Sequence, residues 1–400
     1  MTSASFERPT TTTNSAASPS TPTLLSIILR CHNHPYPLFS SPTTDYFTPF
    51  HLHLGPPTAQ IGFIPKAVLA EILKGDAKGI FIHSEGRVGL ARSLDSFQKR
   101  SNALNSLVRS WRDVGLFRDA LDGWREEMYA VYSSDSHPFN SWERTTRSGT
   151  EVGSRGAVFE LERAACALFG LVTYGVHLTA YTQEPSSSTS ASDADTSSSS
   201  DLLKVWVPRR SASKATWPSY LDNSVAGGIT SGDAPFESIV RECQEEASLS
   251  EDVVRARIQQ AGVVTYVYRT LPLEEGGGYL QPEVQYIYDL PLPAPDFADG
   301  DAEEAKFIPK PNDGEAQSFD LLSVPQIMDL LKKGEFKPNC GLVMLDFLIR
   351  KGVIREGEKD VEGYVEMPQI QLQVQLPQLD IALETPGHAL IPSHMGRAGH

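Results

Sequence analysis

Hydrophobic and polar residues alternate along the chain with two different periods, and together these periods predict a mixed α/β architecture. The segment IGFIPKAVLAEILKG at 61–75 predicts a strand or turn, followed by an amphipathic helix that stops at Gly75. GIFIHSEGRVGL at 79–90 predicts a strand and a turn. The segments 100–115 and 123–132 predict a second helix and a half-buried strand. The first part of the chain is therefore expected to form a small α+β domain.

A second group of elements follows. RGAVFELERAACALFG at 155–170 has apolar residues at helical spacing and predicts a helix. VTYGVHLTAYT at 172–182 and LLKVWVPRR at 202–210 predict two strands. The serine-rich stretch 184–201 between them has almost nothing to bury, so we expect a disordered loop. We interpret this loop as an excursion from a β-hairpin and not as a domain boundary.

The remaining ordered pattern consists of strands and then helices. The segments 261–271, 281–292 and 315–324 predict further strands, and 324–352 predicts two helices broken at Gly334–Pro338. The expected organisation is a disordered tail at 1–23, an N-terminal α+β domain at 24–150, a second domain at 155–355 and a C-terminal extension at 356–400.

The charge balance excludes some classes of partner. The chain has 400 residues and a formal net charge of −15, so it lacks the large basic footprint that nucleic-acid binding requires. The same charge disfavours a general affinity for anionic membranes. The longest apolar run, ALFGLVTYGVHL at 167–178, is too short and too interrupted by glycine to cross a bilayer. We therefore expect a small-molecule ligand, and an anionic ligand would require local cations or a metal.

The cysteines and the N-terminus bear on localisation. Cys31, Cys166, Cys243 and Cys340 lie far apart in the sequence and form no C-x-x-C pair. This spacing argues against a structural zinc site or a disulfide framework and fits a reducing compartment. The first residues are rich in Ser, Thr and Pro and lack a hydrophobic signal core. A cytoplasmic protein is expected, with a weak mitochondrial transit peptide as the minority interpretation.

The stretch SVAGGITSGDAPFESIVRECQEEASL at 224–249 carries the candidate chemistry. Pro235 suits the first turn of a helix, and Asp233 could accept backbone N–H groups there. At helical spacing, four residues form a buried stripe and three carboxylates occupy the adjoining arc. The stripe is Ile239, Val240, Cys243 and Ala247, and the carboxylates are Glu242, Glu245 and Glu246. Because like charges at this spacing repel, a cation is expected to offset the cost.

Three convergent carboxylates form a hard-oxygen site suited to Mg²⁺ or Mn²⁺, with the remaining ligands supplied by water and substrate phosphates. Such a metal polarises a phosphoryl oxygen and helps to generate a nucleophilic hydroxide. Arg241 lies four residues from Glu237 and from Glu245 and could orient carboxylates. Gly227 and Gly228 let the backbone turn sharply and approach a ligand.

This stretch resembles the Nudix box, G-x5-E-x7-R-E-U-x-E-E-x-G-U, where U is aliphatic. Six residues match at the required positions, namely Gly227, Arg241, Glu242, Glu245, Glu246 and Leu249. Three positions depart: Asp233 replaces Glu, Cys243 fills an aliphatic place and Ser248 replaces the closing Gly. An E-x-x-E-E cluster alone is usually a solvated acidic face, but the glycine loop, the arginine and the flanking strands all favour the box.

The resemblance extends beyond the box to roughly residues 25–355. The segments 206–229, 282–290 and 313–352 resemble the fungal and plant Nudix subfamily related to the Nudix domain fused to thiamine pyrophosphokinase, and GFIPKAVLAEIL and GWREEMYAVY resemble its extra N-terminal domain. The resemblance implies an α/β fold, a Nudix α/β/α sandwich with a mixed sheet, preceded by that small α+β domain. It also implies metal-dependent hydrolysis of oxidised, damaged thiamine diphosphate to the monophosphate.

Further residues are candidates for the site. Arg209, Arg210 and Lys214 could contact a diphosphate, although a solvated basic loop explains them equally well. Trp217 could stack on a substrate ring, but a tryptophan is more often part of the core. Glu315 lies where many Nudix enzymes carry an additional catalytic carboxylate, and Glu283 is a weaker rival.

Other functions remain open on the sequence alone. One is a Nudix pyrophosphatase of the ADP-ribose or nucleotide-sugar type. Another is an isomerase on the same fold, as in isopentenyl diphosphate isomerases, although no convincing Cys/Glu proton-transfer pair is present. The third is a catalytically silent diphosphate-binding module, for which the departures at Asp233 and Ser248 are the evidence.

Overall fold

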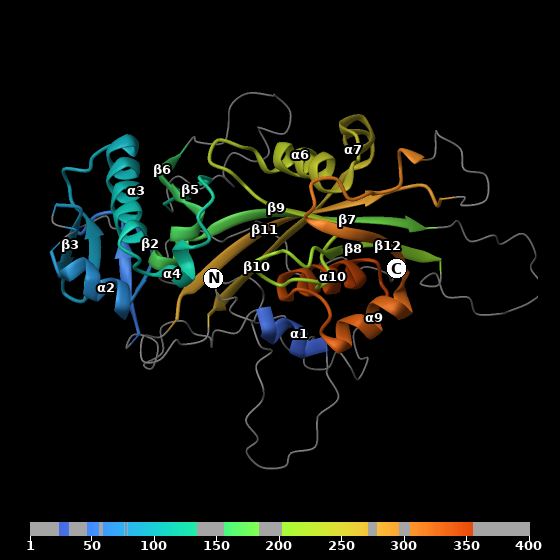
Figure 1. The fold of residues 1–400 in the computed structure, drawn as a ribbon, viewed down its shortest axis with the longest axis horizontal. Helices are drawn as coiled ribbons and strands as arrows, with labels where there is room; N and C mark the ends of the chain where they lie inside the picture. Colours follow the sequence, from blue (N-terminus) through green and yellow to red (C-terminus); the bar gives the residue numbers. More distant parts are fainter. Residues whose placement is uncertain are drawn as a thin grey trace, which may run out of the picture.

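A six-stranded mixed sheet forms the centre of the protein in the computed structural model (Figure 1). The structure describes residues 24–31, 46–55, 59–75, 77, 79–133, 156–183, 202–270, 278–295 and 305–354. The expectations for 1–23, 184–201 and 356–400 lie outside these residues. The strand order is β10-β11-β7-β8-β12, and β9 pairs with β7. The strands are β7 Thr173–Gln183, β8 Leu203–Arg210, β9 Val225–Gly228, β10 Gln259–Arg269, β11 Leu280–Pro291 and β12 Ala316–Ser323.

Strand β11 runs parallel to β7, and the other neighbours in this sheet are antiparallel. The predicted hairpin is confirmed, because Gln183 at the end of β7 is paired with Leu203 at the start of β8. All the strands predicted after residue 170 are present. The parallel β7–β11 pair joins two strands that lie far apart in the sequence, and residues of both strands line the same cavity.

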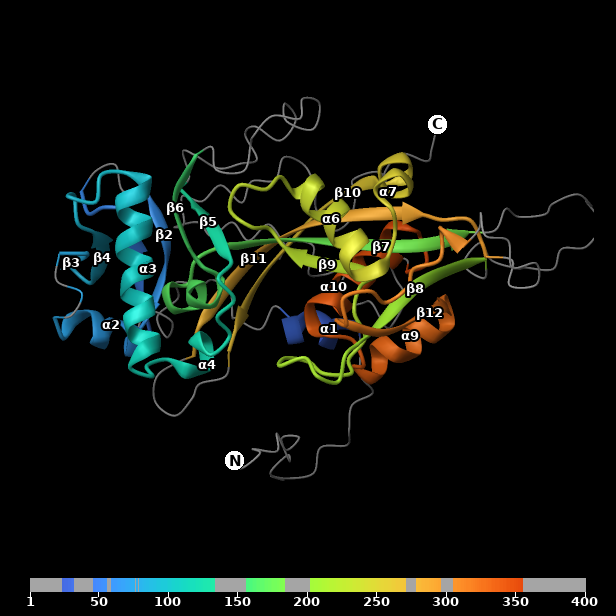
Figure 2. The ribbon, with the colours of Figure 1, turned by 45° about the horizontal axis from the view of Figure 1, so that its top comes forward.

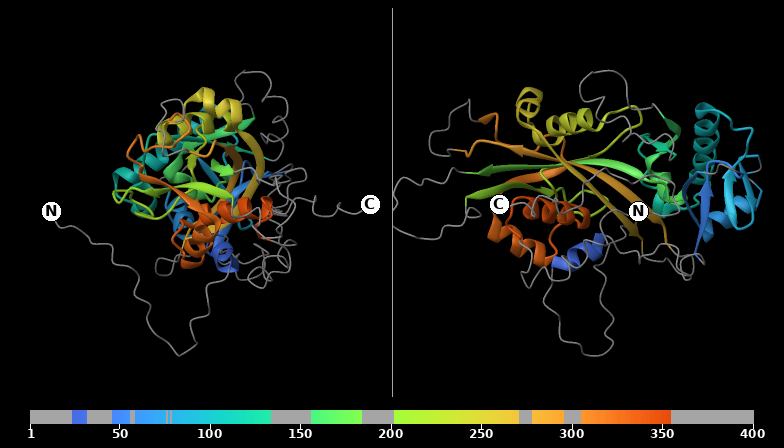
Figure 3. Two further views of the ribbon diagram at one scale, coloured as in Figure 1. Left: turned by 90° about the vertical axis from the view of Figure 1, so that its right-hand side faces the viewer. Right: turned by 180° about the vertical axis from the view of Figure 1, so that it is seen from behind.

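Helices cover both faces of the sheet, as an α/β/α sandwich requires. Helices α6 (Pro235–Ala247) and α7 (Glu251–Arg257) pack on one face. Helices α1 (Leu24–Cys31), α9 (Val324–Lys333) and α10 (Pro338–Arg350) pack on the other. Figure 3 shows the two helical layers on either side of the strands. Among the described residues, no helix has both the length and the apolar character needed to span a membrane.

The N-terminal unit adjoins one end of this sandwich (Figure 2). It contains a four-stranded sheet in the order β2-β1-β4-β3, with helices packed beside it. Its elements are β1 Phe47–His51, β2 Gln60–Pro65, α2 Lys66–Leu73, β3 Phe81–Ser84, β4 Arg87–Leu90, α3 Phe97–Asp113 and α4 Arg118–Leu121. The predicted helices at 61–75 and 100–115 and the strand at 123–132 are present.

The helix expected at 155–170 is wrong. Residues Ala157–Glu162 form strand β6, which pairs with β5 (Met128–Tyr132), and Arg163–Phe169 form the 3₁₀ helix η3. Pairing with a distant strand outweighed the local helical spacing, because β propensity depends on the partner that covers the strand. Gly170 ends η3 in the left-handed conformation at φ 55°.

The boundary between the two units also differs from the expected one. Helix α1 was assigned to the N-terminal domain, but it packs with α9 and α10 in the core of the sandwich. Conversely, β6 and η3 pack with the N-terminal unit. Four side chains of that unit, Phe47, Phe63, Ala130 and Tyr132, join the core beneath α6. The two units therefore share a continuous apolar core.

Candidate active site

Helix α6 presents the predicted two-sided surface. Its stripe of Ile239, Val240, Cys243 and Ala247 is fully buried against the central sheet. Pro235 occupies the first turn, as expected. The expected cap is wrong, because Ala234 is the N-cap residue and no side chain caps the helix.

The residues that depart from the box have identifiable local roles. The Asp233 carboxylate accepts a hydrogen bond of 2.5 Å from the Arg241 guanidinium. Ser248 ends α6 with φ 56°, in the left-handed region that favours glycine. Its hydroxyl donates to the Lys310 carbonyl oxygen at 3.1 Å. Cys243 behaves as a small apolar core residue.

The three carboxylates of α6 differ in their surroundings. Burial raises the pKa of Glu242 to about 7, Arg241 opposes this shift, and neighbouring Glu245 adds to it. Burial also raises the pKa of Glu246 well above its usual value. The Glu246 carboxylate accepts a hydrogen bond of 3.0 Å from the Ala226 backbone N–H. Glu245 is exposed.

All three carboxylates line one cavity of about 440 Å³. Most of the other candidate residues from the sequence line it too, namely Arg210, Lys214, Gly227, Gly228 and Glu315. Arg209, Trp217 and Arg241 are not among its lining residues. The structure thus gathers side chains from α6, from the glycine segment and from the loops flanking β8 and β12.

Gly227 and Gly228 lie where no side chain fits. They lie at the end of β9, which pairs with β7. A Cβ added to Gly227 would overlap the Glu242 carboxylate, and one added to Gly228 would overlap the Tyr129 hydroxyl. Any larger residue would therefore displace side chains that line the cavity.

Arg241 does not pair with Glu237, one of the two carboxylates expected to be its partners. Arg241 pairs with Asp233 and lies 3.7 Å from Glu242, whereas the expected partner Glu237 pairs with Arg255 at 2.5 Å. Because Arg241 contacts Glu242, it is placed to orient that carboxylate rather than to touch a ligand in the cavity.

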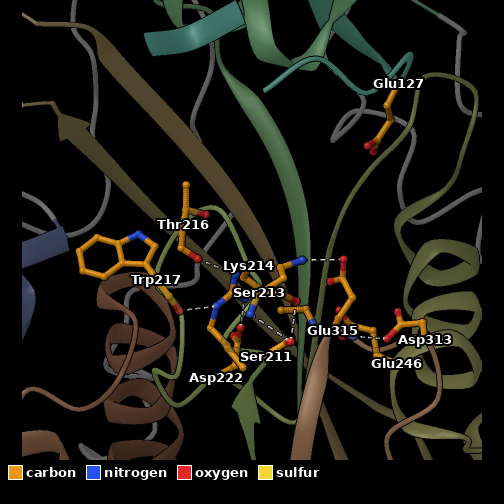
Figure 4. Close-up of polar contacts among 12 residues, drawn as sticks. Glu127, Ser211, Ser213, Lys214, Thr216, Trp217, Asp222, Glu246, Asp313 and Glu315 are labelled. Atoms are coloured by element: carbon orange, nitrogen blue, oxygen red, sulfur yellow. Dashed lines mark hydrogen bonds and ion pairs between the residues drawn. The ribbon is translucent and has the colours of Figure 1, made fainter. Parts of the chain in front are cut away.

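Three candidates for substrate contact are occupied by contacts within the protein. Arg209 donates to the Ser219 carbonyl oxygen at 2.7 Å. Arg210 donates to Asp222 at 2.5 Å and also to the carbonyl oxygens of Thr216 and Trp217. The Trp217 ring lies edge-on to Tyr220 at 5.1 Å. In Figure 4 the Trp217 ring points away from the carboxylates.

Lys214 and Glu315 form the polar centre of the opposite wall. The Lys214 ammonium lies 2.5 Å from the Glu315 carboxylate, and the two are joined in Figure 4. Burial alone would raise the pKa of Glu315, but hydrogen bonding to Lys214 and the lysine charge lower it overall. Glu315 and Glu246 lie close enough for each to shift the pKa of the other. Within the described part of the chain, no three His, Cys, Asp or Glu side chains are already clustered tightly enough to hold a metal ion.

The cavity also has lining residues that sequence reasoning missed. From the N-terminal unit come Glu127, Tyr129 and Arg163, and from the sandwich come His177, Gln285 and Lys337. Glu283, the weaker rival of Glu315, lines it as well. A signal existed for Gln285, because Gln281, Glu283 and Gln285 are polar residues at alternate positions of strand β11.

Comparisons with known proteins place the chain in a family. The uncharacterized protein YJR142W of Saccharomyces cerevisiae is 34% identical over 304 residues, which is 74% of this chain and 75% of that protein. Nudix hydrolase 24, chloroplastic, of Arabidopsis thaliana is 30% identical over 311 residues, covering 77% of this chain and 68% of the relative. The chain belongs to the Nudix hydrolase family. Residues 25–149 of this Nudix hydrolase match a model described as a domain of unknown function, DUF4743.

Two further comparisons are partial. Nudix hydrolase 20, chloroplastic, of Arabidopsis thaliana is 32% identical over 71% of this chain, and the match spans 61% of that relative. The solved structure of DR0079 from Deinococcus radiodurans aligns with 55% of this chain and 98% of its own, at 16% identity and a TM-score of 0.32. Family membership identifies this protein as a hydrolase. It does not identify the substrate, so we consider which ligand the cavity residues could bind.

Proposed function

We propose that this Nudix hydrolase is a Mg²⁺-dependent pyrophosphohydrolase that cleaves a small X-diphosphate. The observation that carries the proposal is the shared cavity, in which three box carboxylates face a glycine segment, Lys214 and Glu315. A diphosphate needs a cation for its charge and a backbone it can approach closely, and the cavity offers groups suited to both needs.

The donor set suits a hard divalent cation. Glu242 and Glu246 are carboxyls whose pKa values are raised by burial, and the neighbouring Glu315 charge adds to the shift of Glu246. Such crowding is what a bound cation would relieve. Mg²⁺ commonly binds through one or two carboxylates plus water and substrate oxygens, so a complete protein cage is not required. We assign Glu242, Glu245 and Glu246 as its ligands, with Mn²⁺ as a substitute.

The remaining residues have roles in binding and proton transfer. Bound Mg²⁺ would neutralise the diphosphate and polarise a phosphoryl oxygen. Glu315 has a lowered pKa, so it is ionised at neutral pH and can accept a proton from the attacking water. The water oxygen bonds to phosphorus as the bridging P–O bond breaks, and the products are a monophosphate and phosphate. Lys214 steadies Glu315, and Arg241 orients Glu242.

We infer oxidised thiamine diphosphate as the preferred substrate. The support is the resemblance across both units, since the box itself selects only for a diphosphate and a metal. One feature of the cavity agrees: the Lys337 ammonium lines it, and Asp222 and Glu283 are among the groups that keep its pKa raised. This positive charge would repel a cationic ring and tolerate a neutral, oxidised one.

A comparison of substrates tests the proposal. Products from oxothiamine diphosphate, thiamine diphosphate and ADP-ribose are separated by chromatography, with Mg²⁺ and with a chelator. We expect kcat/KM to be highest for oxothiamine diphosphate, by about 10- to 200-fold over thiamine diphosphate. A preference for ADP-ribose would overturn the thiamine assignment alone. Equal turnover in the chelator would overturn the metal assignment, and no turnover of any diphosphate would leave only a binding module.

A further inference from the structure

The cavity continues beyond the box carboxylates onto one face of the central sheet. Because β7 and β11 are parallel and in register, Gly175 is paired with Gln285 and Thr173 with Glu283. Residues two apart in a strand point to the same face, so His177 shares this face with Gly175. All of these residues line the cavity. The sheet therefore provides a polar floor next to the proposed diphosphate site.

Gln285 is the unusual residue of this floor. Its side chain is only 4% exposed, and its carbonyl oxygen Oε1 has no hydrogen-bond partner among the described residues. Its Nε2 donates to Glu283 at 2.7 Å and to the Tyr266 hydroxyl at 3.2 Å. The same Glu283 oxygen accepts from the Tyr266 hydroxyl at 2.5 Å, so it is an acceptor and the amide orientation of Gln285 is fixed.

An unpaired buried acceptor is costly, and its persistence indicates a ligand that completes it. Gly175 beside it has no side chain, and a Cβ there would overlap Gln285 Oε1. A side chain at position 175 would therefore cover the acceptor. No described residue donates a hydrogen bond to the other Glu283 oxygen, Oε1, which provides a second acceptor at the cavity.

His177 adds a third acceptor. The Asn223 amide nitrogen donates to the Cys340 carbonyl oxygen at 3.2 Å, so the Asn223 oxygen faces His177 Nδ1 at 2.7 Å. Nδ1 therefore carries the ring proton and Nε2 has a lone pair. Burial lowers the pKa of His177 to about 4, which keeps the ring neutral at physiological pH.

The wall of this region comes from the N-terminal unit. Tyr129 on β5 lies within the segment matched by the domain of unknown function, and Arg163 lies over its ring at 5.3 Å. Glu127 holds Arg163 at 2.6 Å. In Figure 4, Glu127 lies apart from the Lys214–Glu315 group, on the segment before β5. An aromatic side chain of the N-terminal unit therefore lines the same cavity as the acceptors of the sheet.

We propose that this part of the cavity is a head-group subsite for a planar heterocycle with N–H donors, and that Gln285 Oε1 is its specificity-determining acceptor. The inference rests on the proposed function, because the head group is the X of the X-diphosphate. It also gives the N-terminal unit a role, since Tyr129 completes the subsite. An amino group on the ring would satisfy the acceptor that the protein leaves unpaired.

The first experiment uses the unaltered protein. Binding of oxothiamine monophosphate, whose pyrimidine carries an amino group, is measured by calorimetry without metal and compared with its dimethylamino analogue. We expect the analogue to bind about 10- to 100-fold more weakly, since its nitrogen has no hydrogen to donate. Equal affinities would overturn the proposal.

The second experiment changes the acceptor. Gln285→Met keeps the approximate size and removes Oε1, and Gln259→Met at an exposed position of β10 is the matched control. We expect Gln285→Met to bind both ligands with equal, weak affinity, and the control to discriminate as the unaltered protein does. Continued discrimination by Gln285→Met would overturn the assignment of Gln285. Thermal melts establish that each variant is folded.

A third measurement separates this inference from the proposed function. Methyl diphosphate has no head group to recognise, so Gln285→Met should lower kcat/KM for oxothiamine diphosphate by at least about tenfold more than it lowers kcat/KM for methyl diphosphate with Mg²⁺. Equal loss on methyl diphosphate and on oxothiamine diphosphate would overturn the subsite and leave the hydrolase function intact. If no diphosphate is hydrolysed at all, the proposed function fails, and the metal-free binding comparison still decides the subsite.

Discussion

Glu246 carries much of the electrostatic cost of the acidic cluster. It is half-buried, and its pKa is raised by burial and by neighbouring carboxylates, while it accepts a hydrogen bond from the Ala226 N–H. Neighbouring Glu245 is exposed and free to reach a ligand. Glu246 is therefore fixed by contacts within the protein, whereas Glu245 is available to bind a ligand.

Neutral replacements should expose this difference. Glu245→Gln and Glu246→Gln should each lower turnover by about 10²-fold or more, because each removes a ligand of the cation that stabilises charge in the transition state. Glu237→Gln, on the same helix and paired with Arg255 outside the cavity, is the matched control and should retain activity. The measurements are kcat across a Mg²⁺ titration and a thermal melt. Near-normal activity of Glu245→Gln or Glu246→Gln at saturating Mg²⁺ would refute the metal assignment.

His177 gives a pH dependence whose sign follows from its burial. Its pKa is lowered to about 4 by burial and by nearby Lys337, against about 6.5 in an unfolded chain, while Asp222 opposes the shift. Between these values the unfolded state binds more protons, so stability rises with pH through this window. The contribution is complete above pH 6.5 and is lost as the pH falls toward 4.

The loss should be about 3 kcal/mol at most. Urea unfolding from pH 4 to 7 measures the free energy of unfolding. We expect its pH dependence to be smaller in His177→Gln by about 3 kcal/mol over this range. His83→Gln, at an exposed position of β3, should leave the slope unchanged. An unaltered slope in His177→Gln would show that the ring is protonated in the folded state.

At the scale of elements, Pro235 and Ser248 set where α6 begins and ends, and its buried stripe packs it against the central sheet. Pro235 starts it and the left-handed Ser248 stops it, so the three glutamates fall within a single short helix. Ser248 occupies a conformation that costs an L-residue free energy, and the box normally places glycine there. The departure is thus a local backbone strain at the end of α6.

Ser248→Gly should relieve that strain and raise the free energy of unfolding by about 1 kcal/mol relative to Ser248→Ala. Both variants lose the hydroxyl that donates to the Lys310 carbonyl oxygen, so their difference isolates the backbone effect. Chemical denaturation measures it, and activity should be unchanged in both. Equal stability of the two variants would contradict the left-handed assignment.

At the scale of the whole molecule, the N-terminal unit and the sandwich form a single apolar structure. Tyr132 of β5 packs edge-on against Tyr174 of β7 at 5.5 Å, and Phe47 and Phe63 lie in the same core cluster as the α6 stripe. The Ser231 N–H also donates to the Met128 carbonyl oxygen at 2.7 Å. The wall of the cavity is thereby fixed to its floor.

Because the core is continuous, we expect a single cooperative unfolding transition in calorimetry, with equal calorimetric and van't Hoff enthalpies. Tyr132→Ala should destabilise the whole molecule by about 3–5 kcal/mol, in line with losses of large buried aromatic residues. Ile82→Ala, at an exposed position of the N-terminal unit, is the control and should change little. Two resolved transitions, or a loss confined to one of them, would show that the units are independent.

Local sequence patterns were enough to predict helix α6 and the arrangement of its side chains. The spacing within 224–249 predicted α6, its buried stripe and its carboxylate arc, because an amphipathic helix is encoded within a few turns of chain. The sequence also indicated Gly227 and Gly228 as candidates. It did not predict that residues 157–162 pair as a strand, that α1 packs in the core of the sandwich, or that the Arg210 guanidinium binds Asp222.

Only the tertiary structure decided which distant residues share the cavity. Glu283 and Gln285 were polar positions on a predicted strand, but their meaning depended on the parallel pairing of β11 with β7 and on Gly175 opposite. Tyr129 arrives from a separate unit, held by a shared apolar core. Pairing and packing between segments far apart in the chain are set by burial of the whole molecule, which local propensity does not encode.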